Sequence, residues 1–417
     1  MLGRFGRVGR KLRVSTNACG DRPLTAVFIL AACLSLLGCA TGARLPAVPY
    51  IQATRAEVFG IQNARFYAND TKTIHDIADR AYRRRNLARS ASAPQTFLAI
   101  SGGGDDGAFG AGLLVGWSER GDRPTFDVVT GVSTGALSAP FAFLGREYDS
   151  ELRAVYTQTS AAHVFDKRPP LLSAVAADAL VDSAPLRRLI ESYVDAAMVR
   201  RIAEEYDKGR LLFILTTNLD QGRPVIWNIG AIAESHSPQA RQLIVSVLLA
   251  SASIPAVFPP VMIDVTIDGK SYQEMHVDGG TVAQAFLYPP SFSLRSAATH
   301  FRLSAKALRA ARKRVAYIIR NARQSRPEED IKLQTLAIAK QAIATMTASS
   351  GVNDIYRMYL TTQRDGVDFN LAIIGQDFEI PYKGPFDPEY MRTLFDYGYA
   401  QGRAGYPWKK LPPGYSR

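Results

Sequence analysis

Residues 126–135 read FDVVTGVSTG, and this stretch predicts both a strand and a reactive side chain. Its first residues form a mostly apolar run that is typical of a buried strand. Gly131–Gly135 then has the G-x-S-x-G pattern of a nucleophile elbow, with Ser133 at its centre. The two glycines have a steric reason, because a sharp strand-to-helix turn leaves no room for side chains beside the serine. The sequence therefore predicts the Ser133 hydroxyl as a nucleophile, although so short a pattern also occurs without catalysis.

Short apolar runs alternate with helix-like stretches from residue 96 onward. This alternation predicts an α/β fold with a mainly parallel central sheet flanked by helices. The predicted strands are 97–100, 126–130, 211–217, 314–319 and 368–374. The predicted helices are 108–120, 184–206, 238–250, 330–361 and 387–403.

A glycine-rich loop, GGGDDGAFG at residues 102–110, follows the first predicted strand. Such a loop lets backbone N–H groups approach an anion, either a nucleotide phosphate or an oxyanion that develops during catalysis. Asp105 and Asp106 would repel a phosphate, and no Lys-Ser or Lys-Thr pair follows as in a P-loop. An oxyanion hole that serves Ser133 is therefore the better interpretation. Two adjacent acids on one turn point apart, so neither a metal ion nor a cofactor is expected.

A serine nucleophile needs a base, and Asp278 is the stronger candidate. It stands before Gly279 and Gly280, after a stretch that favours a strand. A carboxylate can accept the proton if burial raises its pKa, although Asp-Gly-Gly is also an ordinary turn. Five histidines follow residue 39, and none of them has an obviously catalytic setting. They are His75, His163, His236, His276 and His300.

The N-terminus has the features of a secretory signal. The first 23 residues hold six basic residues and one acid, which gives a net charge of +5. The uncharged run 24–37 follows and is too short to span a bilayer comfortably. Leu36-Leu37-Gly38-Cys39 resembles the lipobox of bacterial lipoproteins, which implies cleavage before Cys39 and lipidation of its thiol. Residues 1–38 are therefore expected to be a signal peptide; a plain signal peptide or a signal anchor is the alternative.

Charge and cysteine content limit the possible partners. The formal charge of +12 falls to +7 without the N-terminal +5, which suits an anionic membrane surface and is weak evidence for nucleic acid. The cysteines are Cys19, Cys33 and Cys39, so only the lipidated one would remain after cleavage. This excludes a disulfide, a cysteine metal site and a cysteine nucleophile. Ala40 after the lipidated cysteine does not suggest retention in the inner membrane, so the periplasmic face of the outer membrane is expected.

Three motifs in order resemble the patatin-like phospholipase family: the glycine-rich loop, the G-x-S-x-G pentapeptide and Asp278-Gly279-Gly280. The segment Ser251–Pro260 resembles the proline-rich stretch before the family's aspartate, and Thr216–Asp220 with the following Gly-Arg-Pro also fits. The resemblance covers roughly residues 94–290, and the C-terminal part is similar to bacterial lipoprotein members. It implies a three-layer αβα fold.

The resemblance also implies a serine lipid acyl hydrolase that cleaves acyl esters with a Ser–Asp dyad. Ser133 would be the nucleophile and Asp278 the base. One departure is Asp106, because many members carry Arg or Lys there to help hold an anionic head group. The oxyanion hole would be formed by the N–H groups of Gly102, Gly103 and Gly104. The other glycines matched by motif position are Gly107, Gly131, Gly135, Gly279 and Gly280.

The expected organisation follows from these assignments. Residues 39–93 would be a lipidated tether and entry region, with Arg83-Arg84-Arg85 as linker or exposed surface. The hydrolase domain would span 94–405, with its core motifs at 97–290 and a C-terminal α/β extension at 300–405, followed by the tail 406–417. The expected partners are acyl-ester or membrane lipid substrates at the bacterial envelope. The alternatives are a Ser-His-Asp esterase or peptidase that uses His276 or His300, and a non-catalytic envelope lipoprotein that binds lipid or a partner protein.

Overall fold

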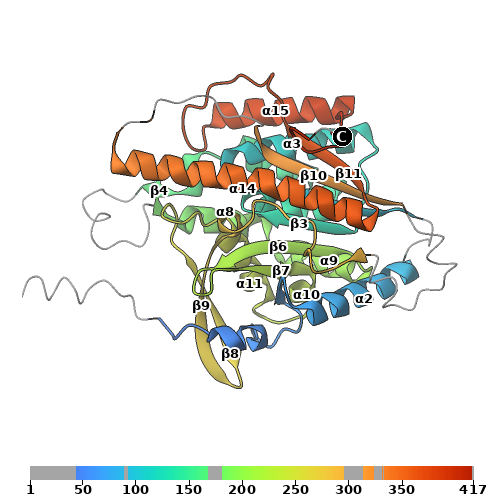
Figure 1. The fold of residues 1–417 in the computed structure, drawn as a ribbon, viewed down its shortest axis with the longest axis vertical. Helices are drawn as coiled ribbons and strands as arrows, with labels where there is room; N and C mark the ends of the chain where they lie inside the picture. Colours follow the sequence, from blue (N-terminus) through green and yellow to red (C-terminus); the bar gives the residue numbers. More distant parts are fainter. Residues whose placement is uncertain are drawn as a thin grey trace, which may run out of the picture. The chain divides into compact units, whose positions relative to one another are not determined.

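A mixed sheet runs through the middle of the molecule (Figure 1). The computed structural model describes residues 44–88, 93–167, 181–294, 313–323, 331 and 333–415, and Leu45 begins one compact unit. Within the described residues the strand order is β1-β7-β6-β3-β2-β10-β11, and β9 of the hairpin β8–β9 also pairs with β6. The strands are β1 Arg65–Tyr67, β2 Gln95–Ile100, β3 Val128–Val132, β6 Leu211–Asn218, β7 Arg223–Asn228, β8 Val261–Ile267, β9 Lys270–Asp278, β10 Arg314–Arg323 and β11 Asp368–Ile374.

The centre of the sheet is parallel, as the sequence predicts. Strands β6, β3, β2, β10 and β11 pair in parallel, with registers such as Phe97 opposite Val128 and Val128 opposite Leu211. These five strands coincide with the five predicted ones, because a strand buried on both faces leaves a continuous apolar run in the sequence. The antiparallel strands β1, β7, β8 and β9 complete one side.

Helices cover both faces of the sheet, so the three-layer arrangement is confirmed. Alternate residues of β2 point to opposite faces: Leu98 and Ile100 join one apolar cluster, whereas Phe97 and Ala99 join the other. The helices that contribute to the first cluster include α3 Gly107–Arg120, α4 Thr134–Leu144, α5 Asp149–Thr157, α8 Ala184–Tyr193, α11 Ala240–Ser251 and α15 Pro388–Ala404. The helices that contribute to the second include α2 Thr71–Ala88 and α14 Thr335–Asp365.

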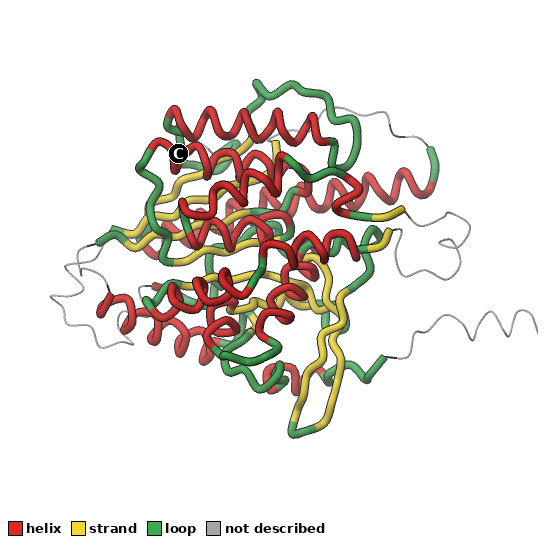
Figure 2. The backbone as a smooth tube through the Cα atoms, turned by 180° about the vertical axis from the view of Figure 1, so that it is seen from behind, coloured by secondary structure: helices red, strands yellow, loops and turns green. Residues whose placement is uncertain are grey.

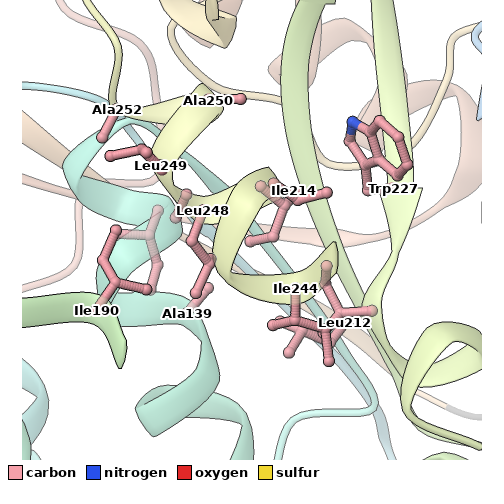
Figure 3. Close-up of a cluster of buried hydrophobic side chains, with 14 of the residues drawn as sticks. Ala139, Ile190, Leu212, Ile214, Trp227, Ile244, Leu248, Leu249, Ala250 and Ala252 are labelled. Atoms are coloured by element: carbon pink, nitrogen blue, oxygen red, sulfur yellow. The ribbon is translucent and has the colours of Figure 1, made fainter. Parts of the chain in front are cut away.

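One part of the core lies between α11 and β6. Figure 3 shows Leu248 and Leu249 of α11 beside Ile214 of β6, with Ala139 of α4 and Ile190 of α8 on the other side. All these side chains are buried. The hairpin β8–β9 extends from this region away from the body of the protein (Figure 2). The remaining helical segments are η1 Tyr50–Arg55, η2 Gly104–Asp106, η3 Arg146–Tyr148, α6 Ala161–Val164, α9 Ala196–Asp207, α10 Ile229–Glu234 and η4 Gly279–Thr281, and the two-stranded ribbon is β4 Asp166–Lys167 with β5 Val181–Asp182.

The part of the predicted tether and entry region that the structure describes is folded. From Leu45 onward the chain belongs to the compact unit, β1 pairs with β7, and α2 packs under the sheet. Arg85 is also not exposed surface: it is 3% exposed, and its Nε donates to Asp127 Oδ1 at 2.8 Å. The sequence did not predict this, because the three arginines are adjacent and only Arg85 pairs with a buried carboxylate.

Two further boundaries differ from the prediction. The single helix expected at 184–206 is two helices, α8 and α9, and α9 is capped by Asp195, whose side chain accepts from the Met198 N–H. The predicted tail is packed as far as Tyr415: Lys409 forms a bridge with Leu371 of β11.

Residues 1–43, which include the predicted signal peptide and Cys39, lie outside the described residues. Among the described helices, none has both the length and the apolar character that crossing a membrane requires.

Candidate active site

Ser133 lies between β3 and α4, at the edge where the parallel strands end. Its φ of 54° and ψ of −125° are values that a non-glycine residue rarely adopts. Such strain persists only where the surroundings fix it. Here the Ser133 N–H donates to Ser251 Oγ at 3.0 Å, and the Ser251 hydroxyl donates to the Leu215 carbonyl at 2.7 Å. The chain thus has the strand–turn–helix geometry of a nucleophile elbow at Ser133.

Close backbone approaches explain the glycines of the elbow. A Cβ at Gly131 would lie 2.5 Å from the Gly135 carbonyl oxygen, and a Cβ at Gly135 would lie 2.3 Å from the Ile100 carbonyl oxygen. A Cβ at Gly107, at the start of α3, would lie 2.2 Å from Thr134 Oγ1. These distances are far below van der Waals contact, so the steric reason expected for the elbow glycines holds in the structure.

The pairing of β9 with β6 brings Asp278 next to Ser133. Asp278 is the last residue of β9, which pairs antiparallel with β6, and its carboxylate accepts a hydrogen bond from the Ser133 side chain. A second hydrogen bond comes from the Gly280 N–H to Asp278 Oδ1 at 2.7 Å. Burial raises the pKa of Asp278 to about 7, and the two hydrogen bonds oppose this increase. Asp278 is therefore a carboxyl group that exchanges a proton near neutral pH, in contact with the strained serine.

The glycine loop lies beside Ser133, but its first amide is occupied. The Gly102 N–H donates to the Gln284 carbonyl at 2.9 Å, so this amide is not free for an oxyanion. Of the three predicted oxyanion donors, the N–H groups of Gly103 and Gly104 remain as candidates. Gly104 has a φ of 58° and lines the same pocket as Ser133. A Cβ at Gly103 would lie 2.0 Å from the Asn321 carbonyl oxygen, so only glycine fits there.

His276 is not placed to serve Ser133. His276, two residues before Asp278, is buried, and its Nδ1 and Nε2 are hydrogen-bonded to Thr216 Oγ1 at 2.9 Å and to Glu274 Oε2 at 3.0 Å. Burial lowers the pKa of His276. Its two ring nitrogens are therefore engaged away from the serine, which argues against the Ser-His-Asp alternative for this residue. His300 lies outside the described residues.

An apolar pocket opens beside Ser133. Its wall comes from α4, α5, α6, α8, the segment after α11 and the C-terminal region. The side chains are mostly aliphatic or aromatic and include Leu137, Val164, Leu189, Phe258, Phe386 and Met391. A pocket of this character accepts a hydrocarbon chain and has few groups that could bind a charged ligand.

The two acids of the glycine loop face the C-terminal region. Asp105 Oδ2 accepts from the Phe386 N–H at 2.6 Å, and Asp106 Oδ1 accepts from the Tyr390 hydroxyl at 2.6 Å. Burial raises the pKa of Asp105, although hydrogen bonds from Phe386 and Tyr382 oppose the increase. Within the described residues no group of three or more His, Cys, Asp and Glu side chains is arranged to hold a metal ion.

Three residues that support the site had no signal of their own in the sequence. Ser251 was part of a quoted motif but had no assigned role. Gln284 accepts from Gly102 and donates through Nε2 to the Gly280 carbonyl at 2.7 Å, so it links the glycine loop to the turn after Asp278. Asn321 of β10 donates through Nδ2 to the Ser101 carbonyl at 2.9 Å. Single polar residues far apart in the chain become recognisable only when the fold brings them together.

Comparison with known proteins agrees with the motifs. The sequence family described as Patatin-like phospholipase matches residues 98–288. No curated protein shows significant similarity to the chain. Among solved structures, the crystal structure of VipD from Legionella pneumophila matches with a TM-score of 0.33 and 12% sequence identity, over 75% of this chain and 66% of that chain. The chain thus spans slightly less than two thirds of VipD, and the assignment rests on the family match.

That match includes the glycine loop, the elbow and Asp278, the three features that meet in the structure. Residues 98–288, slightly less than half of the chain, therefore match a patatin-like phospholipase domain.

Proposed function

We propose that the protein is a serine lipid acyl hydrolase that cleaves carboxylic esters with a dyad of Ser133 and Asp278. The observation that carries the proposal is the hydrogen bond between these two side chains, with the pKa of Asp278 raised by burial to about 7. A base with a pKa near the working pH combines a useful deprotonated fraction with the ability to accept a proton. The family match supports an ester hydrolase in general.

In the first half of the reaction, the Ser133 oxygen attacks the ester carbonyl carbon while Asp278 accepts the hydroxyl proton. The carbonyl oxygen becomes an oxyanion, which we assign to the N–H groups of Gly103 and Gly104. A preorganised donor of this kind typically contributes about 3 kcal/mol to transition-state stabilisation. The tetrahedral intermediate collapses, the C–O bond to the alcohol breaks, and the proton on Asp278 passes to the leaving alcohol.

In the second half, Asp278 accepts a proton from water, which attacks the acyl-enzyme. The Ser133 ester bond breaks, the fatty acid leaves, and the proton returns to the serine oxygen. The apolar pocket beside Ser133 would hold the hydrocarbon chain in both halves. We further propose that Cys39 anchors the enzyme at the bacterial envelope, in the outer membrane, where lipid esters are at hand.

The dyad is tested with fluorogenic acyl esters and a fluorophosphonate probe. Ser133→Ala and Asp278→Asn should each lower kcat/KM by about 10³-fold or more, and Ser133→Ala should abolish labelling. Surface variants of the same chemistry, Ser150→Ala and Asp264→Asn, should retain wild-type activity. In the wild type, kcat/KM should fall as the pH drops below about 7, because protonated Asp278 cannot accept the serine proton.

His276→Ala separates the dyad from a triad. If this variant folds but loses activity and labelling as fully as Ser133→Ala, the base is His276 and the dyad is wrong. If wild-type protein neither labels nor hydrolyses any ester, a binding role for the lipoprotein is favoured instead.

A further inference from the structure

The connection between β11 and α15 crosses the glycine loop. We call residues 377–387 of this connection the strap; it leads from the sheet to the first turn of α15 (Figure 1). Arg323 at the end of β10 holds its start: Nη2 donates to the Ile380 carbonyl at 3.2 Å, and the guanidinium lies 5.2 Å from the centroid of the Phe378 ring. The strap is therefore attached to the sheet edge at which Ser133 lies.

The two acids of the glycine loop hold the far end of the strap and the first turn of α15. Asp105 is 7% exposed, and it accepts from the Phe386 N–H at 2.6 Å and from the Tyr382 hydroxyl. Asp106 accepts from the Tyr390 hydroxyl at 2.6 Å. Hydrogen bonds to an ionised acceptor are stronger than those between neutral groups, so this pair of acids is an effective attachment.

Phe386 is held in a strained conformation. Its φ is 55°, in the left-handed region where a bulky residue is an outlier. The hydrogen bond to Asp105 fixes its N–H, and its ring lies 6.0 Å from the ring of Phe165 in an edge-to-face contact. Phe386 lines the pocket together with Ser133 and Met391. Strain of this kind persists where the surroundings enforce it and is frequent at functional sites.

We infer that Phe386 is a specificity-determining residue that limits the acyl chain, and that Asp105 and Asp106 are positioning residues that hold the strap so that Phe386 closes the pocket. The inference rests on the proposed function, since it assigns the pocket to the acyl group. It also gives a role to Asp106, which stands where many family members carry a cation, and to its neighbour Asp105. In this chain that part of the loop binds the protein's own C-terminal region and not a head group.

The size of the pocket then depends on one aromatic ring. Removing the ring should admit longer chains, and enlarging it should exclude them. Differences of one methylene in an apolar pocket change kcat/KM by about tenfold or more. The ratio of kcat/KM for a long and a short ester is therefore a sensitive readout, and a general loss of activity would not change it.

The test is the kcat/KM profile of the full chain over saturated acyl esters from acetate to palmitate. Phe386→Ala should raise the ratio of the longest to the shortest ester by about tenfold or more, and Phe386→Trp should lower it. Asp105→Ala should change the ratio in the same direction as Phe386→Ala, because the strap is released. Asp105→Asn keeps an acceptor oxygen and should restore most of the wild-type ratio. Lys383→Ala, an exposed change on the same strap, should leave the ratio unaltered.

Failure of the inference can be distinguished from failure of the proposed function. If the wild type hydrolyses esters and folded Phe386→Ala and Phe386→Trp keep its ratio, Phe386 does not set specificity and the inference is wrong. If the wild type hydrolyses none, the proposed function fails, and binding of saturated fatty acids to Ser133→Ala with and without Phe386→Ala tests the pocket. An unchanged dependence of affinity on chain length would overturn the inference there too.

Discussion

Asp278 combines two opposite requirements in one residue. It is buried, which raises its pKa to about 7, and in the proposed mechanism it must also be tolerated as an anion in order to act as a base. The hydrogen bonds from Ser133 and from the Gly280 N–H make the anion tolerable, because each stabilises the charged form. Because burial disfavours the charged form of Asp278, this residue should lower the free energy of unfolding at neutral pH, and unfolding experiments can measure the effect.

Asp278→Asn should make the protein more stable at neutral pH. The pKa is about 7 when folded against a model value of 3.8, so the folded state binds more protons and wild-type stability falls as pH rises between these values. Asparagine does not ionise, so the stability of the variant does not fall in this way as the pH rises. The free energy of unfolding of the variant minus that of the wild type should rise by about 1.4 kcal/mol per pH unit in this window and level off above it, as measured by urea unfolding.

Asp264→Asn on exposed β8 is the control and should show no such pH dependence. A difference between Asp278→Asn and wild type that is constant from about pH 4 to pH 8 would mean that Asp278 has an ordinary pKa in the folded protein.

Glu274 is a second buried carboxyl group near the site, and its pKa is lowered, whereas that of Asp278 is raised. Burial alone would raise the pKa of Glu274, but Arg65 and His276 lower it to about 2. Arg65 comes from β1, in the segment that is predicted from the sequence to be a tether and entry region. This ion pair helps to explain why β1 belongs to the sheet, because the carboxylate of Glu274 is fully buried and needs a cation.

At the scale of elements, the helices α3 and α15 approach each other through glycines. A Cβ at Gly112 of α3 would lie 2.0 Å from the Phe395 carbonyl oxygen, and one at Gly116 would lie 2.1 Å from that of Tyr399. Gly398 and Gly402 of α15 have equally close contacts with α3. The two helices thus touch backbone to backbone, which fixes α15 and, through it, the end of the strap beside the glycine loop.

Gly116→Ala should separate these helices and destabilise the protein. The added methyl group meets a backbone oxygen that cannot turn away, and such overpacking costs about 1–3 kcal/mol. Urea unfolding gives the change in free energy. Gly351→Ala in α14 is the matched control, since its Cβ would meet nothing closer than 3.5 Å and alanine favours a helix by about 0.5–1 kcal/mol. Equal effects of both substitutions would contradict the close approach.

At the scale of the whole molecule, the proposed location depends on one side chain. Cys39→Ser should move the protein from the membrane fraction to the soluble periplasmic fraction and abolish incorporation of labelled palmitate, because serine offers no thiol for the lipid. Cys33→Ser changes a cysteine within the expected signal peptide and should leave the anchoring intact. Membrane association of Cys39→Ser at the wild-type level would refute the lipid anchor.

The parallel centre of the sheet and the positions of Ser133 and Asp278 in their turns could be predicted from the amino-acid sequence. Both are local properties: strands buried on two faces need continuous apolar runs, and an elbow needs glycines beside its serine. Strands β1, β7 and β8 were missed; all three are antiparallel, and β8 alternates between buried and less buried residues, which leaves no continuous apolar run.

Only the tertiary structure decided which groups are available for chemistry. Gly102 was a predicted donor, but Gln284 occupies its amide; His276 was only an alternative base, and Glu274 and Thr216 engage its ring. Asp105 looked like an obstacle to an anion, and it holds Phe386 in the pocket wall instead. A hydrogen bond between residues far apart in the chain depends on where the fold brings them, and no local pattern specifies that.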